Sequence, residues 1–385
     1  MSELGRSGRS GRSGRSGRSG RSGRSGRSGD EGLADHAGGE ASPLLSQALT
    51  QTHDGIAGFW DAKPANLPDE FSTKDDDILY LRYSTRGLML DHELFSGVEV
   101  TGNSTATVVK QRTLGTMFFQ VARPAPDFFG QQLRFMRSYA DLREDRIPEI
   151  SVQIDDILSF FGAIALIDDQ RRLKTMELLE AVIRLCIFVE LKVKHLCRAK
   201  RPVDYAPELQ PIIQTPDHST FPSGHATEAF AVATVLHRLM TKGIEGPLAG
   251  VTAQAQPFRL AARIAVNRTV AGVHFPGDTA AGAVLGCMLG EYVHRLGTGA
   301  KPVTSATPVF GVRPLGSGKP DDKTFYADMD FSLAWLASAL PEDPKATPPV
   351  DPAISRAGSQ TEAAATVSPT ILETFWRKAL DEFKL

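Results

Sequence analysis

The sequence predicts an all-α fold, a helical bundle that follows a disordered N-terminal tail. From about residue 77 onward, apolar residues recur at spacings of three and four, which is the period of an amphipathic helix. Alternating, strand-like runs are scarce, and we expect one small strand region near Ile78–Val100. With 385 residues, of which 41% are hydrophobic, the chain is long enough to bury one large core or two modest ones.

The N-terminal tail is a low-complexity segment. Gly5 to Ser28 consists of eight Gly-Arg-Ser repeats, whose period of three resembles collagen but lacks the proline of a triple helix. None of these side chains can build a core, so we expect disorder through the repeat and the polar linker, over residues 1–49. The repeat is either a basic arm that touches anionic surfaces or an expanded tandem repeat without a role.

The remaining chain is predicted to contain a helical domain at residues 50–296 and a C-terminal part at residues 297–385. The C-terminal part is a Pro/Gly-rich wrap or linker that ends in an amphipathic helix over Pro369–Leu385. The helices predicted within the domain are Gln131–Leu142, Ile150–Leu166, Arg172–Arg198, Ala226–Met240, Phe258–Ala271 and Thr279–Leu296.

Charge and hydropathy argue against several classes of protein. The net charge of −2 combines a basic tail with an acidic body, which does not favour nucleic-acid binding. The longest apolar runs, Ala226–Leu236 and Thr279–Gly290, are shorter than the roughly 20 residues that cross a bilayer. We therefore expect no membrane span and, without a recognisable signal peptide, a cytoplasmic location. Cys186, Cys197 and Cys287 are expected to be buried free thiols.

A first block of charged residues, KHLCRAKRP, runs from Lys194 to Pro202. Lys194 and Arg201 are seven residues apart, or two helical turns, so we expect both cations to project from one helix face. Pro202 should then end the helix. Taken alone, such a block is typical of a solvated helix end.

A second block, FPSGH, directly precedes an apolar helical segment. Ser223 can cap this helix, and Gly224 allows a ligand to approach the backbone. The unpaired N–H groups and the positive end of the helix dipole would converge beside His225 on a phosphate-sized anion. The alternative is a capped helix start without a ligand.

A third block, NRTVAGVHFPGD, runs from Asn267 to Asp278. Arg268 lies near the end of one predicted helix, His274 follows in the loop, and Asp278 begins the next helix. A carboxylate within reach of one imidazole nitrogen fixes the tautomer, and this makes the other nitrogen a better nucleophile or ligand. Taken alone, His274 could be an ordinary loop residue.

The three blocks occur in the order Lys-x6-Arg-Pro, Pro-Ser-Gly-His and Arg-x5-His-x3-Asp. In this order they resemble the signature of the superfamily that joins vanadium-dependent haloperoxidases with bacterial acid phosphatases and type 2 phosphatidic-acid phosphatases. The resemblance implies the helical bundle of that superfamily and a site for a tetrahedral oxyanion, which is a vanadate cofactor or a phosphate. The residues that it implies hold this anion are Lys194, Arg201, Ser223, Gly224, Arg268 and His274.

The resemblance also implies a role for each histidine. His274 either coordinates vanadium as the metal ligand or attacks phosphorus to form a phosphohistidine, and Asp278 orients it. His225, on the opposite side of the anion, would transfer protons at the apical oxygen or the leaving group. His218 occupies a position where bromide-oxidising members carry a histidine; alternatively, it only hydrogen-bonds its own loop.

From these features we expect a vanadate-dependent haloperoxidase that oxidises bromide or iodide with hydrogen peroxide. The alternative is a soluble phosphomonoesterase of the acid-phosphatase type that forms a phosphohistidine. A minor alternative is a non-catalytic helical scaffold that binds phosphate. A homodimer is expected from the family alone.

Overall fold

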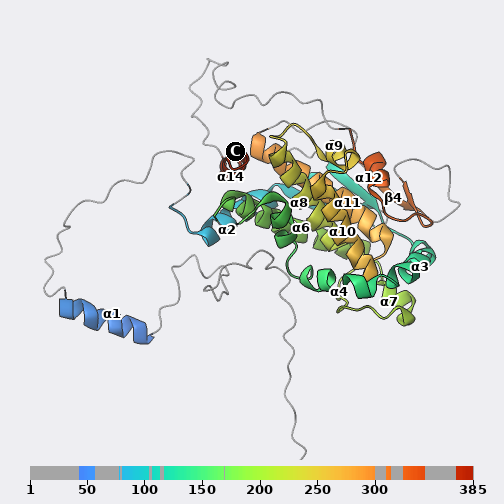
Figure 1. Ribbon diagram of the computed structural model, residues 1–385, viewed down its shortest axis with the longest axis horizontal. Coiled ribbons are helices and arrows are strands. Elements are labelled where there is room, and N and C mark those ends of the chain that lie inside the picture. Colours follow the sequence, from blue (N-terminus) through green and yellow to red (C-terminus); the bar gives the residue numbers. More distant parts are fainter. Residues whose placement is uncertain are drawn as a thin grey trace, which may run out of the picture.

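Two long helices, α8 (Gly224–Met240) and α11 (Pro276–Thr298), pack side by side at the centre of the computed structural model (Figure 1). Gly282, Gly286 and Gly290 recur every four residues along α11 and face α8. A Cβ atom added to Gly286 would lie 2.3 Å from the carbonyl oxygen of Thr227. The two helices can approach this closely only because α11 has no side chains at these positions.

The structure describes residues 43–56, 78, 80–103, 106–112, 117–168, 170–299, 309–313, 324–342 and 370–384. Helices dominate these residues, which confirms the predicted all-α class. The predicted disorder of the Gly-Arg-Ser repeat falls outside the described residues, and the division into three parts remains a prediction. The polar stretch before residue 49 departs from expectation, because a helix begins at Pro43.

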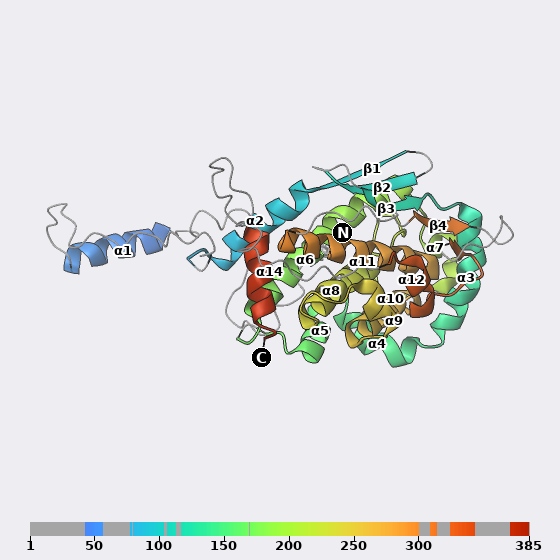
Figure 2. The ribbon, with the colours of Figure 1, turned by 90° about the horizontal axis from the view of Figure 1, so that it is seen from above.

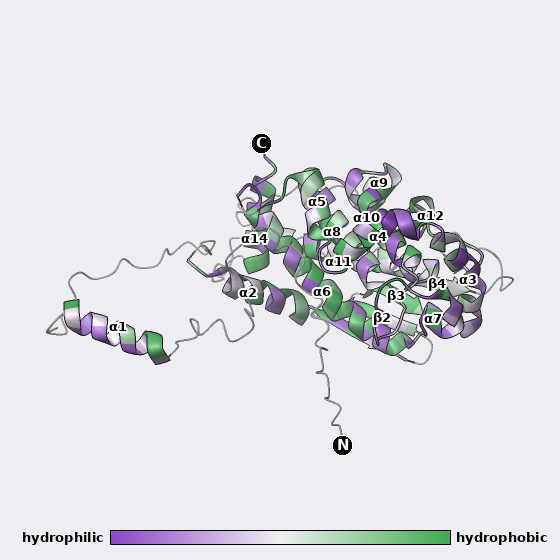
Figure 3. Cartoon of the chain, turned by 60° about the horizontal axis from the view of Figure 1, so that its bottom comes forward, coloured by the Kyte–Doolittle hydropathy of each residue, from purple (hydrophilic) through white to green (hydrophobic). Residues whose placement is uncertain are grey.

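Further helices surround the central pair, with α6 and α10 against α8 and with α14 against α6 and α11 (Figures 1 and 2). Helix α6 carries hydrophobic and hydrophilic residues on different sides, as its apolar spacing predicts (Figure 3). The bounds are α1 Pro43–Ile56, α2 Tyr83–Ser96, α3 Pro126–Ala140, α4 Arg143–Val152, α5 Leu158–Ala165, α6 Leu173–Cys197, α7 Pro202–Tyr205, α9 Pro247–Thr252, α10 Gln256–Val270, α12 Leu333–Ala339 and α14 Ile371–Asp381.

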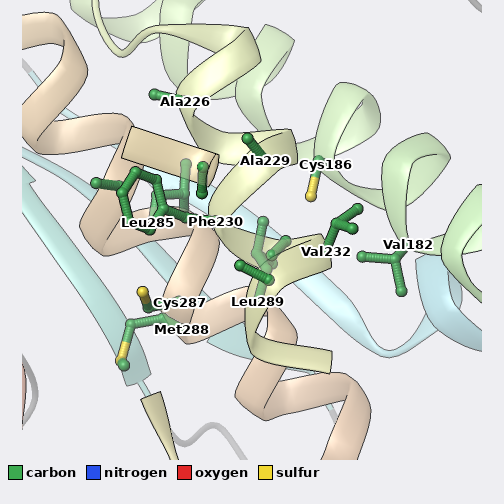
Figure 4. Close-up of a cluster of buried hydrophobic side chains, with 14 of the residues drawn as sticks. Val182, Cys186, Ala226, Ala229, Phe230, Val232, Leu285, Cys287, Met288 and Leu289 are labelled. Atoms are coloured by element: carbon green, nitrogen blue, oxygen red, sulfur yellow. The ribbon is translucent and has the colours of Figure 1, made fainter. Parts of the chain in front are cut away.

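The core lies between α6, α8 and α11. Val182 from α6, Phe230 from α8 and Leu289 from α11 are fully buried in it (Figure 4). The three cysteines are buried and free, as predicted.

One predicted helix, Ile150–Leu166, is divided into α4 and α5. The reason is local: the carboxylate of Asp156 accepts a hydrogen bond from the backbone N–H of Ser159 at 2.9 Å, so a new helix begins there.

A five-stranded sheet lies along one side of the bundle (Figure 2). Its first three strands form an antiparallel meander, and β4 and β5 continue the sheet with parallel pairing. The strands are β1 Val98–Gly102, β2 Ala106–Gln111, β3 Met117–Ala122, β4 Val309–Arg313 and β5 Thr324–Tyr326.

The predicted strand region near Ile78–Val100 was misplaced. Helix α2 takes most of it, because Leu90 and Leu94 are four residues apart and are both buried on one helix face. Strand alternation begins only at Val98. The C-terminal part also contains more than a wrap, since it supplies β4, β5 and α12 to the described structure.

The C-terminal helix α14 is tied to the bundle at both ends. At its start, the backbone N–H groups of Ile371 and Leu372 donate to Glu93 of α2 at 2.9 and 2.8 Å. Just after its end, Glu382 accepts hydrogen bonds from the N–H groups of Lys174 and Thr175, both at 2.9 Å. Glu382 thereby caps α6, the helix that carries Lys194 at its other end.

Candidate active site

The three sequence blocks meet where α6 and α10 end and α8 and α11 begin. The start of α8 is fixed against that of α11, because the N–H of Ser223 donates to the carbonyl oxygen of Asp278 at 3.0 Å. All the residues that the sequence singled out lie at or beside this junction.

Lys194 lies in the last turn of α6 with 1% of its surface exposed. Its Nζ donates to the carbonyl oxygens of Pro222 at 2.7 Å and Ser219 at 3.4 Å. Burial lowers the pKa of this ammonium group, while the nearby carboxylate of Glu190 acts in the opposite direction. Lys194 therefore both supplies positive charge and holds the turn that leads into α8.

Arg201 is not on the same helix face as Lys194, contrary to the sequence prediction. Helix α6 ends at Cys197, and Arg198 turns the chain in the left-handed conformation with φ of 51°. Arg201 then precedes α7, whose first residue is Pro202. The two cations come together through this turn, and the proline begins a helix rather than ending one.

The guanidinium of Arg201 contacts both loop histidines. Its Nε donates to the carbonyl oxygen of His218 at 3.1 Å, and its Nη1 donates to that of Val273 at 2.9 Å. Nη1 also lies 3.2 Å from Nε2 of His274, and Nη2 lies 3.1 Å from Nδ1 of His218. Because arginine only donates hydrogen bonds, Nε2 of His274 must be an acceptor. Nδ1 of His218 also lies 3.3 Å from the carbonyl oxygen of Ser219, so its two contacts do not fix its tautomer.

His274 is therefore a neutral imidazole whose proton is on Nδ1. That nitrogen lies 3.2 Å from Oδ2 of Asp278 and 3.2 Å from the hydroxyl of Thr220. Burial, followed by the charges of Arg201 and Lys194, lowers the pKa of His274 well below its usual value. The lone pair of Nε2 is thus available at neutral pH.

Asp278 is fully buried at the start of α11. Its Oδ2 accepts hydrogen bonds from the N–H of Phe275 at 2.9 Å and from the hydroxyl of Thr220 at 2.5 Å. Burial raises the pKa of Asp278 to about 6, against the opposing effect of the Thr220 hydrogen bond. The carboxyl group is thus ionised at neutral pH and can hold the Nδ1 proton of His274.

Arg268 lies near the end of α10 and is 1% exposed. Its Nη2 donates to the carbonyl oxygen of Ile150 at 3.2 Å and to Oε1 of Gln153 at 3.3 Å. Its Nε and Nη1 are buried and have no hydrogen-bond partner among the described residues. Asn267 also binds Oε1 of Gln153, at 3.0 Å, so Gln153 joins this arginine to the segment after α4.

His225 lies in the first turn of α8. Its Nε2 is 2.8 Å from the carbonyl oxygen of Gln153, so this nitrogen carries the proton. Burial and the charge of Arg268 lower the pKa of His225 to about 3. Ser223 is at the N-cap position of α8, but its hydroxyl does not make the expected capping bond and is buried without a partner among the described residues.

His218 supports Arg201, to which it offers both its carbonyl oxygen and Nδ1. Burial and the charges of Lys194 and Arg201 lower the pKa of His218 to about 4. The imidazole is therefore neutral and already occupied by the arginine.

Gly224 has a different neighbour from the one the sequence suggested. A Cβ atom at this position would lie 2.5 and 2.7 Å from the two carboxyl oxygens of Glu190, so a side chain of α6 packs against the Cα of Gly224, where any other residue would clash. Glu190 was not identified from the sequence, although it lies four residues before Lys194 on the same helix. Thr220 and Gln153 were not identified either, because their roles depend on contacts between elements.

Several buried donors at this junction have no partner among the described residues: Ser223 Oγ, Arg268 Nε, Arg268 Nη1 and Gln153 Nε2. Buried polar groups are normally paired, so these donors indicate a missing acceptor. Together with the first N–H groups of α8, they suit a tetrahedral oxyanion such as phosphate or vanadate.

Comparison with known proteins identifies the family. The sequence model of the PAP2 superfamily matches residues 175–300, which contain all three blocks. Over 143 residues, the chain is 32% identical to the decaprenylphosphoryl-5-phosphoribose phosphatase of Mycobacterium tuberculosis, in both strain CDC 1551 and strain H37Rv. This match covers 37% of the present chain and 71% of the relative. The chain belongs to the PAP2 superfamily.

Among solved structures, this PAP2 chain is similar to a transmembrane PAP2-type phosphatidylglycerolphosphate phosphatase from Bacillus subtilis. The identity is 21% and the TM-score 0.27, over 44% of this chain and 77% of the other.

The comparisons correct two expectations. The predicted haloperoxidase activity, with its oxidoreductase chemistry, is wrong, because the Mycobacterium tuberculosis relative, of which the match covers 71%, is a phosphatase. The predicted cytoplasmic location is not retained, and the similar Bacillus subtilis protein is described as transmembrane. In the described part of this chain, no helix combines the length and apolar character that a membrane crossing requires.

Proposed function

We propose that this PAP2 protein hydrolyses a phosphomonoester through a phosphohistidine formed on His274. The observation that carries the proposal is the state of this imidazole. Nδ1–H is directed to Asp278, and the Nε2 lone pair lies 3.2 Å from Arg201. A nucleophile held by a buried carboxylate beside unpartnered cationic donors suits attack on phosphorus.

The proposed reaction has two steps. Nε2 of His274 attacks phosphorus, the P–O ester bond breaks, and the leaving oxygen takes a proton from His225, which acts as an imidazolium that gained its second proton from solvent when the phosphoryl dianion bound beside it. A water molecule then attacks phosphorus and gives a proton back to His225, and the P–N bond breaks to release phosphate and regenerate His274. Lys194, Arg201 and Arg268 would neutralise the equatorial oxygens, with hydrogen bonds from Ser223 and the N–H of Gly224.

Two existing hydrogen bonds must be exchanged during this cycle. Arg201 has to move its Nη1 from Nε2 of His274 to the phosphoryl oxygens before attack. His225 has to release the carbonyl oxygen of Gln153 to reach the leaving group. Binding of the oxyanion favours both exchanges, because charge-assisted hydrogen bonds are stronger than neutral ones.

We propose a lipid-linked phosphomonoester as substrate class. The name of the Mycobacterium tuberculosis relative, which includes a decaprenylphosphoryl group, supports this choice. Exposed apolar side chains on either side of Gln153 in the chain also support it: Val152 and Ile154 are 51% and 40% exposed. An apolar chain attached to the phosphate could cover them at a gain of roughly 25 cal/mol per Å².

The test is turnover of two phosphomonoesters, p-nitrophenyl phosphate and a short prenyl phosphate, with and without vanadate. We expect hydrolysis of both, a lower KM for the prenyl compound, and inhibition by vanadate as a mimic of the five-coordinate transition state. His274→Ala should abolish turnover while largely keeping phosphate binding.

His195→Ala provides the matched control, because this exposed histidine lies on α6 next to Lys194 and should leave turnover unchanged. A wild-type protein that binds phosphate but hydrolyses neither ester would instead support the non-catalytic scaffold. Full activity of the His274 variant would disprove the proposed nucleophile.

A further inference from the structure

Two carboxyl groups on the helices that hold the oxyanion site, one of them against Gly224, have no part in the reaction proposed above. Glu190 is one helical turn before Lys194 on α6, and Glu228 is one turn after Gly224 on α8. Glu190 is 5% exposed, and its Oε2 has no hydrogen-bond partner among the described residues. A buried carboxylate without hydrogen bonds is costly, so its presence beside the site requires an explanation.

The carboxyl group of Glu190 touches the first residue of α8. A Cβ atom on Gly224 would lie only 2.5 Å from its Oε1. This is the helix end whose unpaired N–H groups and positive dipole favour an anion. Glu190 thus lies against the same helix start that would bind a phosphoryl group.

The charged neighbours of the two carboxyl groups are the cations of the site. The positive charges of Lys194 and Arg201 lower the pKa of Glu190. The charge of Glu190 raises the pKa of Glu228, whereas those of Lys194 and Arg268 lower it. The other titratable group nearby is the thiol of Cys186, whose pKa burial raises well above its usual value. The two glutamates therefore provide negative charge that faces these three cations from α6 and α8, and Asp278 faces Lys194 and Arg201 from α11.

Two neighbouring carboxylates in a buried site do not ionise independently. Burial raises the pKa of Glu190, although Lys194 and Arg201 act against this shift. Burial and the charge of Glu190 raise the pKa of Glu228. The pair consequently retains a proton more readily than ordinary glutamates do, and a further negative charge nearby would increase its proton affinity.

We propose that Glu190 and Glu228 couple oxyanion binding to proton uptake. In the anion-free site, the negative charge of the pair, which increases with pH, balances Lys194, Arg201 and Arg268 together with Asp278. When a phosphoryl dianion binds these cations, its negative charge neutralises them instead, and the pair takes up a proton. The inference rests on the proposed function only in that the ligand is a phosphate-like oxyanion.

This coupling has a defined sign. As the pH rises, the pair loses its proton more readily, and its negative charge then competes with the bound anion. Affinity for a dianion should therefore fall with rising pH, and product phosphate should leave more easily. Both glutamates act through the cations and the helix start, so they are positioning residues rather than catalytic ones.

The experiment is calorimetric titration of the full-length protein with tungstate, which remains a tetrahedral dianion throughout the neutral pH range. Titration in two buffers of different ionisation enthalpy gives the number of protons taken up with each anion. We expect uptake by the wild-type protein and a smaller uptake by Glu190→Gln. At alkaline pH, this variant should bind tungstate about tenfold more tightly, which corresponds to one unit of pKa.

Glu180→Gln is the matched control on the same helix, away from the site, and should keep wild-type uptake and affinity. If Glu190→Gln does not fold, Glu228→Gln provides the same comparison. Tungstate binding without proton uptake in the wild type would overturn the proposal. Uptake unchanged in both glutamate variants would also overturn it.

The outcome is separable from that of the proposed function, because tungstate binding requires no turnover. A protein that takes up protons with tungstate but hydrolyses no ester supports the coupling and refutes the phosphatase. A protein that hydrolyses the esters but binds tungstate without proton uptake supports the phosphatase and refutes the coupling. Failure to bind tungstate at all would refute the coupling together with the oxyanion site.

Discussion

At the scale of single residues, Arg201 determines the protonation of the site. Its N–H groups can only donate, so His274 must turn an unprotonated nitrogen toward it. His274 then has its proton on Nδ1, where Asp278 accepts it. One guanidinium thus specifies the tautomer of His274, a residue that was identified from the sequence without any knowledge of this contact.

The hydroxyl of Thr220 should set the acid side of the pH profile. It donates to Asp278 and opposes the burial that raises the pKa of this carboxyl group to about 6. Activity should fall as the pH drops through this value, because a protonated Asp278 no longer holds the Nδ1 proton of His274. In Thr220→Val, the pKa of Asp278 rises further, and we expect this limb of kcat/KM to move about one pH unit upward.

Thr220→Ser keeps the hydroxyl and should leave the limb where it is in the wild-type protein. If the acid limb of kcat/KM lies at the same pH in the wild type and both variants, the ionisation of Asp278 does not control it.

Replacing His218 should weaken the binding of the anion by Arg201. The variant His218→Ala loses the Nδ1 acceptor, and we expect the inhibition constant of phosphate to rise about tenfold, the effect of one charged hydrogen bond. Asparagine can supply an acceptor oxygen, so His218→Asn should recover part of the affinity. Equal inhibition of His218→Ala and the wild type would contradict the supporting role.

At the scale of secondary-structure elements, the contact between α8 and α11 depends on the absence of side chains. The glycines of α11 let the helices approach until Ser223 N–H reaches the carbonyl oxygen of Asp278. This bond aligns the start of α8, with Ser223 and His225, to the start of α11. The packing of two helices therefore sets the distance between two of the sequence blocks.

Gly286→Ala tests this packing. The added methyl group would lie 2.3 Å from a backbone oxygen, so we expect the free energy of unfolding to fall by about 1–3 kcal/mol. Gly130→Ala in α3 is the control, since nothing lies within 4 Å of its added carbon. That variant should gain about 0.4–1 kcal/mol. Chemical denaturation measures both, and changes of the same sign would contradict the close-packing argument.

At the scale of the whole molecule, chain segments far apart in sequence hold the site together. Glu93 of α2 binds the start of α14, and Glu382 caps the start of α6. The last residues of the chain thereby stabilise the helix that presents Glu190 and Lys194. Sequence periodicity predicted the closing helix but not the elements that it joins.

The cap formed by Glu382 should contribute to global stability. Glu382→Ala leaves the N–H groups of Lys174 and Thr175 without this acceptor, and we expect a loss of about 0.5–2 kcal/mol in the free energy of unfolding. Asp381→Ala is the control, because it removes a neighbouring, exposed carboxylate that pairs with Lys384, and it should cost less than about 1 kcal/mol. If thermal or chemical unfolding shows equal stability losses for the two variants, the cap contributes no more to the free energy of unfolding than the exposed ion pair does.

The sequence by itself determined the helical class, the order of the three blocks and the oxyanion site that they resemble. These depend on spacing within one segment, such as the four residues between His274 and Asp278, and local geometry follows from local sequence. Only the tertiary structure decided that Arg201 leaves α6 and binds two histidines, that Glu190 touches Gly224, and that the strands lie after α2.

The choice between peroxidase and phosphatase was also beyond the sequence motif. It rested on His218, whose environment is set by Arg201 across a separation of 17 residues. Burial and neighbouring charge arise from several elements at once, whereas a motif records only residue types and their spacing. The residues that could hold an oxyanion were thus readable from the sequence, while their protonation states and partners required the fold.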